Sequence, residues 1–172
     1  MDKLELTGIT EIQARALCCD IAQHVLDSLT PIGIEATDQF ETLYECLEVA
    51  RGAVNGEASD VDLLKASITA RKIFHGGGVA VFAGPVWAAC SVYRDYPKDT
   101  SNLRYISLDI GKPSHALGFA SMVACEAVSI GATMKYLLRG EDWSKRPEYL
   151  EAWEKELQWQ KSKTNEYLME AA

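Results

Sequence analysis

Apolar residues recur every three or four positions through most of this 172-residue chain, which is the spacing of helices with one buried face. Thr10 and Gln13 have the spacing of a capping box, and the apolar positions after them predict a helix over about 11–29. A second helix is expected over about 37–54, before the turn signal Asn-Gly. Its apolar stripe consists of Phe40, Leu43, Tyr44, Leu47, Ala50 and Val54.

Three further helices are indicated. Ser59 is expected to cap a helix that runs to His75. Segment 114–138 predicts a central helix packed on more than one side, because small residues on one face let neighbouring helices approach closely. The last helix is expected to begin at Pro147 and to end near Met169. The small residues are Gly118, Ser121, Ala124, Ala127 and Gly131, and the apolar stripe of the last helix is Leu150, Trp153, Leu157, Thr164 and Leu168.

The middle of the chain is ambiguous. Residues 79–83 are uninterruptedly apolar, and Pro85 favours the start of a helix over about 85–95. Periodicity does not decide whether 79–83 is a short buried strand or a helix continued through the proline. Apolar and polar residues alternate over 103–110, so this segment is a strand candidate that would pair with 79–83. The expected fold is one mainly α domain over 1–172, a bundle of five or six helices, with the two-stranded element left open.

Acidic side chains are concentrated in the first third of the chain. Residues 1–64 hold 3 basic and 13 acidic side chains, a net charge of −10, whereas the rest carries +2 and the whole chain −8. Nucleic-acid binders carry basic stripes, because neutralising phosphates supplies most of their affinity. Direct nucleic-acid binding is therefore not expected. The excess of acidic side chains instead favours a basic protein partner.

Two features are candidates for partner binding. Asp38, Glu41, Glu45 and Glu48 lie opposite the apolar stripe of the second helix, where they form either a merely solvated face or a docking surface for a basic protein. Trp159 falls off the apolar stripe of the last helix. It is either embedded between two elements or an exposed interface anchor.

The segments of the sequence that resemble catalytic motifs are incomplete. His75–Gly78 resembles the oxyanion loop of lipases, but no Gly-x-Ser-x-Gly nucleophile motif accompanies it, so the hydrolase interpretation is rejected. Gly111–Ser114 lacks the first glycine of a phosphate-binding loop. His24, His75 and His115 have no metal-ligand spacing, so no metal, cofactor or enzymatic activity is expected. A small-molecule or enzymatic site near His75 and His115 stays open as an alternative.

The cysteines and the apolar segments bear on location. Cys18, Cys19, Cys46, Cys90 and Cys125 are odd in number and contain no C-x-x-C pair, so we expect buried free thiols. The uncharged run His75–Tyr93 is broken by glycines and a proline, and Glu126 and Lys135 interrupt the other apolar segment. No membrane span is expected, and the acidic first residues are unlike a secretory signal. The expected location is the cytoplasm.

Several short motifs resemble those of the immunity proteins of bacterial polymorphic toxin systems, in particular the Imm-5-like group. They are Cys46–Glu57, the small-residue segment His115–Thr133, Trp153 and Glu156–Gln160. The resemblance implies a small, mostly helical cytoplasmic protein that binds a toxin and occludes it. The triple glycine at 76–78 and the strand candidate at 103–110 depart from the pattern, and no binding residues carry over.

The expected function is thus non-enzymatic: a protein-binding inhibitor of the immunity type that neutralises a basic toxin through its acidic helical face. One alternative is an inhibitor from a phage or mobile element that uses the same surface to mimic phosphate against a host nucleic-acid-binding machine. Whether the protein forms a homodimer is left open.

Overall fold

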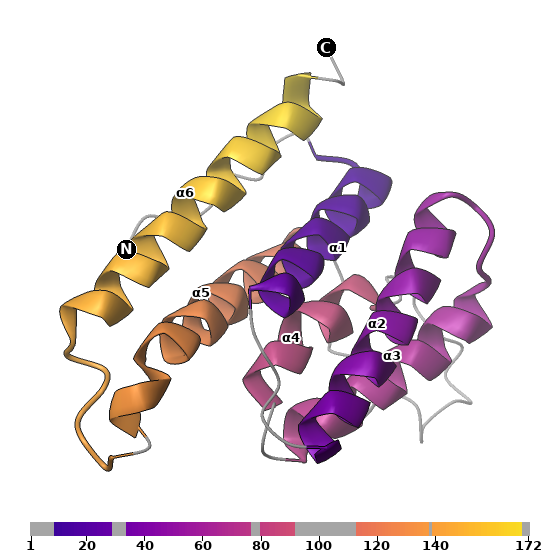
Figure 1. Ribbon diagram of the computed structural model, residues 1–172. Coiled ribbons are helices and arrows are strands. Elements are labelled where there is room, and N and C mark those ends of the chain that lie inside the picture. Colours follow the sequence, from indigo (N-terminus) through magenta and orange to yellow (C-terminus); the bar gives the residue numbers. More distant parts are fainter. Residues whose placement is uncertain (1–8, 29–33, 77–79, 92–112, 138, 170–172) are drawn as a thin grey trace.

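The computed structural model describes residues 9–28, 34–76, 80–91, 113–137 and 139–169, and in this part of the chain it contains six helices and no strand. The mainly α fold is therefore confirmed (Figure 1). The helices are α1 (Glu11–Asp27), α2 (Ile34–Val54), α3 (Asp60–His75), α4 (Ala80–Ala89), α5 (Pro113–Leu137) and α6 (Pro147–Met169).

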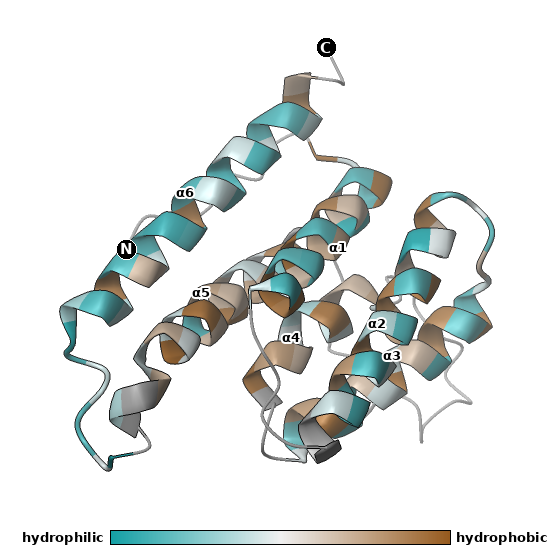
Figure 2. Ribbon diagram, viewed as in Figure 1, coloured by the Kyte–Doolittle hydropathy of each residue, from teal (hydrophilic) through white to brown (hydrophobic). Residues whose placement is uncertain are grey.

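The helices α1, α4 and α5 form the centre of the bundle, and each packs against the other two. The helices α2 and α3 cover one side of this group, and α6 lies along α5 and α1 on the other side (Figure 1). Hydropathy follows the same arrangement, since α4 is largely apolar whereas α6 is mostly hydrophilic (Figure 2). The core lies where α1, α4 and α5 meet, and α2 adds one buried face to it.

Both capping predictions are confirmed. The Thr10 hydroxyl accepts from the backbone N–H of Gln13 at 3.2 Å, and the Gln13 side chain accepts from the backbone N–H of Thr10 at 3.0 Å. Ser59 and Asp62 make the same reciprocal pair at the start of α3. The hydrogen bonds from Ser59 hold the pKa of the Asp62 carboxyl below its ordinary value. Side chains close to one another in sequence thus determine these two helix starts.

Of the two alternatives left open for 79–83, the structure shows the helix continued through the proline, because Ala80–Ala83 form the first part of α4 and the short strand is wrong for them. The helix predicted over 85–95 begins five residues earlier and ends at Ala89, so that Pro85 lies inside it. Every residue from Phe82 to Cys90 is buried, and a helix that is apolar all round carries no periodic signal. The strand candidate at 103–110 lies outside the described residues.

The helix α5 packs against α1, α4 and α6, as its small residues predict. Ala116, Ala120, Ala124 and Ala127 are fully buried. Gly118 is an exception, since it is exposed and a Cβ placed there would meet no atom within 4 Å. Close approach occurs instead at Gly84 of α4.

One stretch of α5, His115–Met134, is long and apolar enough to cross a membrane. Glu126 is the only acidic or basic residue in this stretch, and one charge does not exclude a membrane span by composition. This differs from the sequence analysis, which expected no span. Half of the stretch is buried inside the bundle. A central helix of a helical bundle has the same composition, because it is covered on several sides.

The buried face of α6 differs from the predicted apolar stripe. Leu150 is exposed, and Trp153, Leu157 and Leu168 are only half-buried. The buried residues of the helix are Glu156, Gln160 and Thr164, which lie four residues apart and face the bundle. The fully buried side chains of this outermost helix are therefore polar, while the half-buried rings of Trp159 and Tyr167 also pack against the core.

All five cysteines are buried free thiols, as expected. Burial raises the pKa of Cys46 to about 11 and those of Cys19 and Cys125 to about 12. It also raises the pKa of Cys18 and Cys90 well above the ordinary value. Since the thiolate is the reactive form, these residues act as small apolar side chains.

We predict that Gly84→Ala destabilises the protein. A Cβ at this position would lie 2.5 Å from Cγ1 of Val123 and 3.2 Å from the Phe74 ring, and both neighbours are held in the packed bundle. Overpacking costs about 1–3 kcal/mol and outweighs the gain of up to about 1 kcal/mol in helix propensity. Urea denaturation should therefore give a lower free energy of unfolding. The control is Gly118→Ala, which gains propensity without a clash and should stabilise; equal effects at the two glycines would contradict the packing described here.

We also predict that none of the five thiols reacts with a disulfide reagent at about pH 8 in the native protein, and that all five react after denaturation. The measurement is the number of thiols titrated with and without denaturant. A thiol that reacts at once in the native state would show that its helix does not cover it.

Candidate partner-binding surface

The four predicted acidic residues lie on one exposed face of α2. Asp38, Glu41, Glu45 and Glu48 are three, four and three residues apart, which places them along one side of the helix, and all four are exposed. We call this set the acidic face. The opposite side packs into the bundle, with Phe40, Leu43, Leu47 and Ala50 buried and Tyr44 and Val54 half-buried. The predicted division of α2 into an apolar and an acidic side is confirmed.

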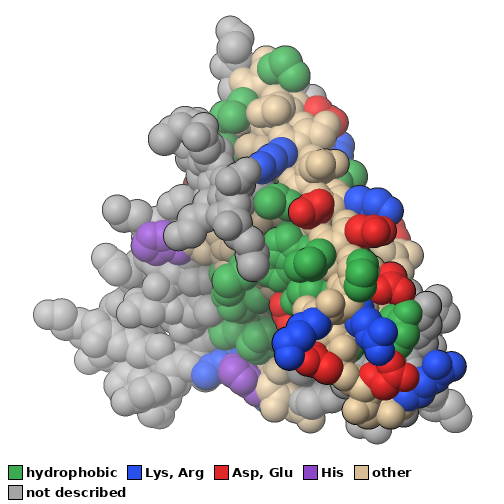
Figure 3. Space-filling model, turned by 90° about the vertical axis from the view of Figure 1, so that its left-hand side faces the viewer, with side chains coloured by type: hydrophobic (Ala, Val, Ile, Leu, Met, Phe, Trp, Pro, Cys, Tyr) green, Lys and Arg blue, Asp and Glu red, His purple; other side chains and the backbone are tan. Residues whose placement is uncertain are grey.

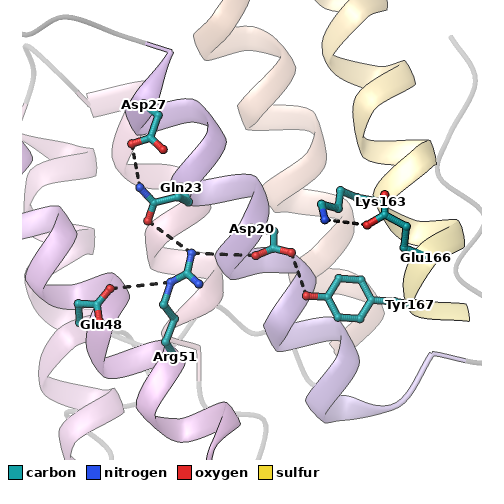
Figure 4. A network of polar contacts seen from close by, with 8 residues as sticks. All are labelled: Asp20, Gln23, Asp27, Glu48, Arg51, Lys163, Glu166 and Tyr167. Carbon is teal, nitrogen blue, oxygen red and sulfur yellow. Dashed lines mark hydrogen bonds and ion pairs between the residues drawn. The ribbon is translucent and has the colours of Figure 1, made fainter. Parts of the chain in front are cut away.

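Arg51 lies one helical turn after Glu48, the last residue of the acidic face, and its side chain contacts three neighbours (Figure 4). Its Nε lies 3.9 Å from Oε1 of Glu48, while its Nη2 lies 4.0 Å from Oδ1 of Asp20 and donates to Oε1 of Gln23 at 3.4 Å. Asp20 and Gln23 belong to α1, so Arg51 joins α2 to α1. Long contacts of this kind in a half-exposed position offset little of the negative charge.

Asp27, at the end of α1, extends the network. Asp27 accepts from Nε2 of Gln23 and from the Tyr44 hydroxyl, both at 2.8 Å. Burial, together with the hydrogen bond to Asp27, raises the pKa of Tyr44 to about 12, so the hydroxyl remains a donor at neutral pH. These contacts hold Asp27 in place, but they use neutral donors and leave its negative charge uncompensated.

The second cation of α1 and α2 faces the interior. Arg15 is buried, and its Nη1 donates to the carbonyl oxygens of Ala89 and Ser91 at 2.8 and 2.9 Å. Residues 11–54 hold eight acidic side chains and only these two arginines. Among the described residues, no lysine, arginine or histidine forms an ion pair with Asp38, Glu41 or Glu45. The surface of α2 therefore presents unneutralised carboxylates to solvent.

The structure does not bring Trp159 to the acidic face. It lies on α6, and α1 separates α6 from α2 (Figure 1). Its ring is half-buried against the core and stacks on the His24 ring, with centroids 4.0 Å apart and planes 11° apart. This placement corresponds to the embedded alternative of the sequence analysis.

The Trp159–His24 stack lines a groove of about 510 Å³ between α1, α5 and α6. Glu156 also lines it, with its side chain only 1% exposed and its Oε2 3.1 Å from Nε2 of His24. Sequence reasoning missed this pair, because the two residues are far apart in the chain and Glu156 is not part of the predicted apolar stripe of the last helix. Only the burial of Glu156, which no sequence pattern signals, identifies it.

A second groove, of about 460 Å³, is largely apolar. Its lining residues are Phe74, Val81, Met122, Val123, Glu126 and Trp153. The side of the molecule turned to the viewer in Figure 3 carries a cluster of hydrophobic side chains bordered by charged ones. Met122, at 58% exposure, is among the most exposed large apolar residues.

His75 and His115, the alternative site, are both exposed, and neither lines the two grooves. The His75 ring contacts Phe74 and Trp87, with centroids 5.2 and 5.8 Å apart. Among the described residues, no group of three or more His, Cys, Asp or Glu side chains is arranged to hold a metal ion.

Comparison with known proteins adds no relative: no family model, no curated protein and no solved structure matches the chain. The resemblance to immunity proteins remains a prediction from short motifs, and the geometry of the acidic face stands without it.

Proposed function

We propose that this protein binds a basic protein partner through the acidic face and inhibits it by occlusion, without catalysing a reaction. The observation that carries the proposal is the row of exposed carboxylates on α2, three of which have no ion-pair partner among the described residues. Like charges three and four residues apart destabilise an isolated helix by a few tenths of a kcal/mol per pair. A basic partner would relieve this repulsion on binding.

A rigid support makes the row suitable for recognition. The buried side of α2 is fixed in the core, and Arg51 joins its last turns to α1. The positions of these residues along the helix are therefore set before any partner arrives. A concentrated negative surface also speeds the encounter with a positively charged protein, an effect that salt weakens.

The resemblance to immunity proteins supports a toxin as the partner. Toxins that act on nucleic acids need basic surfaces to hold phosphates, so an acidic face competes with their substrate directly. The same chemistry would serve an inhibitor encoded by a phage or mobile element against a host nucleic-acid-binding machine. A toxin gene beside the gene for this protein supports the first function, and phage genes support the second.

The test is affinity capture from the source cells, followed by titration of the captured protein. In the variant Glu41→Lys/Glu45→Lys, the reversed charges should weaken binding about tenfold or more at low salt and reduce its salt dependence, because the attraction is electrostatic. Binding is measured by calorimetry at several salt concentrations.

The matched control is Glu151→Lys/Glu154→Lys, which changes the net charge equally on exposed positions of α6. It should retain near-native affinity. Equal loss in both variants would mean that only overall charge matters, and no loss in the α2 variant would overturn the role of the acidic face.

A further inference from the structure

The helix α6 buries polar side chains in addition to packing the rings of Trp159 and Tyr167 against the core. Its buried residues are Glu156, Gln160 and Thr164, exposed by 2%, 0% and 3%. Gln160 accepts from the Ser121 hydroxyl of α5 at 2.5 Å and donates its Nε2 to Oε1 of Glu156 at 2.8 Å. Polar groups are well solvated once they are exposed, so undocking α6 costs less than undocking an apolar helix.

Hydrogen bonds, a ring stack and an ion pair join α6 to α1. Near its C-terminal end, the Tyr167 hydroxyl donates to Oδ2 of Asp20 at 2.9 Å, and its carbonyl oxygen accepts from Nε2 of Gln13 at 3.0 Å (Figure 4 shows the first). Nearer the middle of α6, the Trp159 ring stacks on the His24 ring of α1, and Oε2 of Glu156 lies 3.1 Å from Nε2 of His24. This last contact is the one that involves a buried ionisable group.

The Glu156 carboxyl is incompletely satisfied. Its Oε1 accepts from Gln160, but its Oε2 is buried and has no hydrogen-bond donor in good geometry among the described residues. The His24 Nε2, 3.1 Å away, is the ionisable neighbour within ion-pair distance. Burial raises the pKa of Glu156, against the lowering effects of the Gln160 hydrogen bond and of His24.

Two protonation states satisfy this contact: an imidazolium facing a carboxylate, and a neutral imidazole accepting from a carboxylic acid. Each carries one more proton than a neutral imidazole beside a carboxylate, and that proton belongs to the pair. Its loss leaves a neutral imidazole, whose Nε2–H tautomer still donates to Oε2, but no positive charge remains to offset the buried carboxylate, which is unfavourable.

We propose that the proton between His24 and Glu156 fastens α6 to α1, so that the docking of α6 is pH-dependent and weakens as the pH rises. The sign follows from linkage. Docked α6 holds a proton that the solvated carboxyl of undocked α6 releases, so rising pH favours the undocked state. The proposal does not depend on the acidic face.

The other charged groups around the pair do not replace the proton. In the groove, Glu148 accepts from the Tyr136 hydroxyl, and Glu151 and Lys155 are exposed. Lys155 is the only lysine or arginine among the described residues that line the groove, and it forms no ion pair with Glu156.

Among the described side chains of α5 and α1, none besides His24 forms an ion pair with Glu156. On α5, the Cys125 thiol remains neutral because its pKa is raised to about 12, and Glu126 accepts from the Tyr149 hydroxyl. On α1, Asp20 and Asp27 are acidic and bind tyrosine hydroxyls.

The experiment is hydrogen–deuterium exchange of the full chain, read by mass spectrometry from about pH 6 to about pH 9.5, a range that begins near the ordinary pKa of histidine. Rates are corrected for the pH dependence of unprotected amides, and α3 serves as internal reference. In the wild type, protection of α6 should fall about tenfold or more across this range relative to α3, since one unit of pKa difference is a tenfold effect.

Two variants remove the proton requirement by different means. Glu156→Gln removes the buried carboxylate, and His24→Gln removes the imidazole that carries the positive charge. Both should make the protection of α6 independent of pH, whatever its absolute level, and the exposed control Glu154→Gln should keep the wild-type slope. A flat wild-type profile, a wild-type slope in both variants, or loss of protection in α6 and α3 together would overturn the proposal.

Discussion

The mutual packing of α1, α4 and α5 is the constraint on which the rest of the structure depends. The helix α4 is buried along nearly its whole length, and Gly84 lets it approach α5 at Val123 more closely than any side chain would allow. Arg15 of α1 donates to the carbonyl oxygens of Ala89, at the end of α4, and of Ser91 just after it. These hydrogen bonds join α1 to α4. The outer helices pack on this centre and inherit their orientation from it.

The two outer helices on opposite sides use polar chemistry differently. The helix α2 has an apolar buried side and directs its carboxylates outward, so its charges act on other molecules. The helix α6 buries a carboxylate, an amide and a hydroxyl, so its polar groups act within the fold. Binding by α2 needs a fixed surface, whereas the polar attachment of α6 makes its position sensitive to the protonation of one buried pair.

Much of the fold could be predicted from local pattern. The capping boxes at Thr10 and Ser59, the apolar stripe of α2 and the start of α6 at Pro147 all depend on residues within two turns of one another. The acidic face was predictable for the same reason. The small residues of α5 indicated a helix with several neighbours, although they misplaced Gly118, because spacing alone does not say which side a neighbour occupies.

The amino-acid sequence by itself determined where most helices begin and end and which side of α2 is charged, because these features arise from contacts three or four residues apart. Tertiary structure alone decided that Ala80–Ala83 are helical, since a segment buried all round has no polar side to reveal its period. It also decided that Trp159 stacks on His24, and that His24 meets a buried Glu156. These residues come together only when α6 folds back onto α1, and a contact between distant segments depends on the packing of every helix between them.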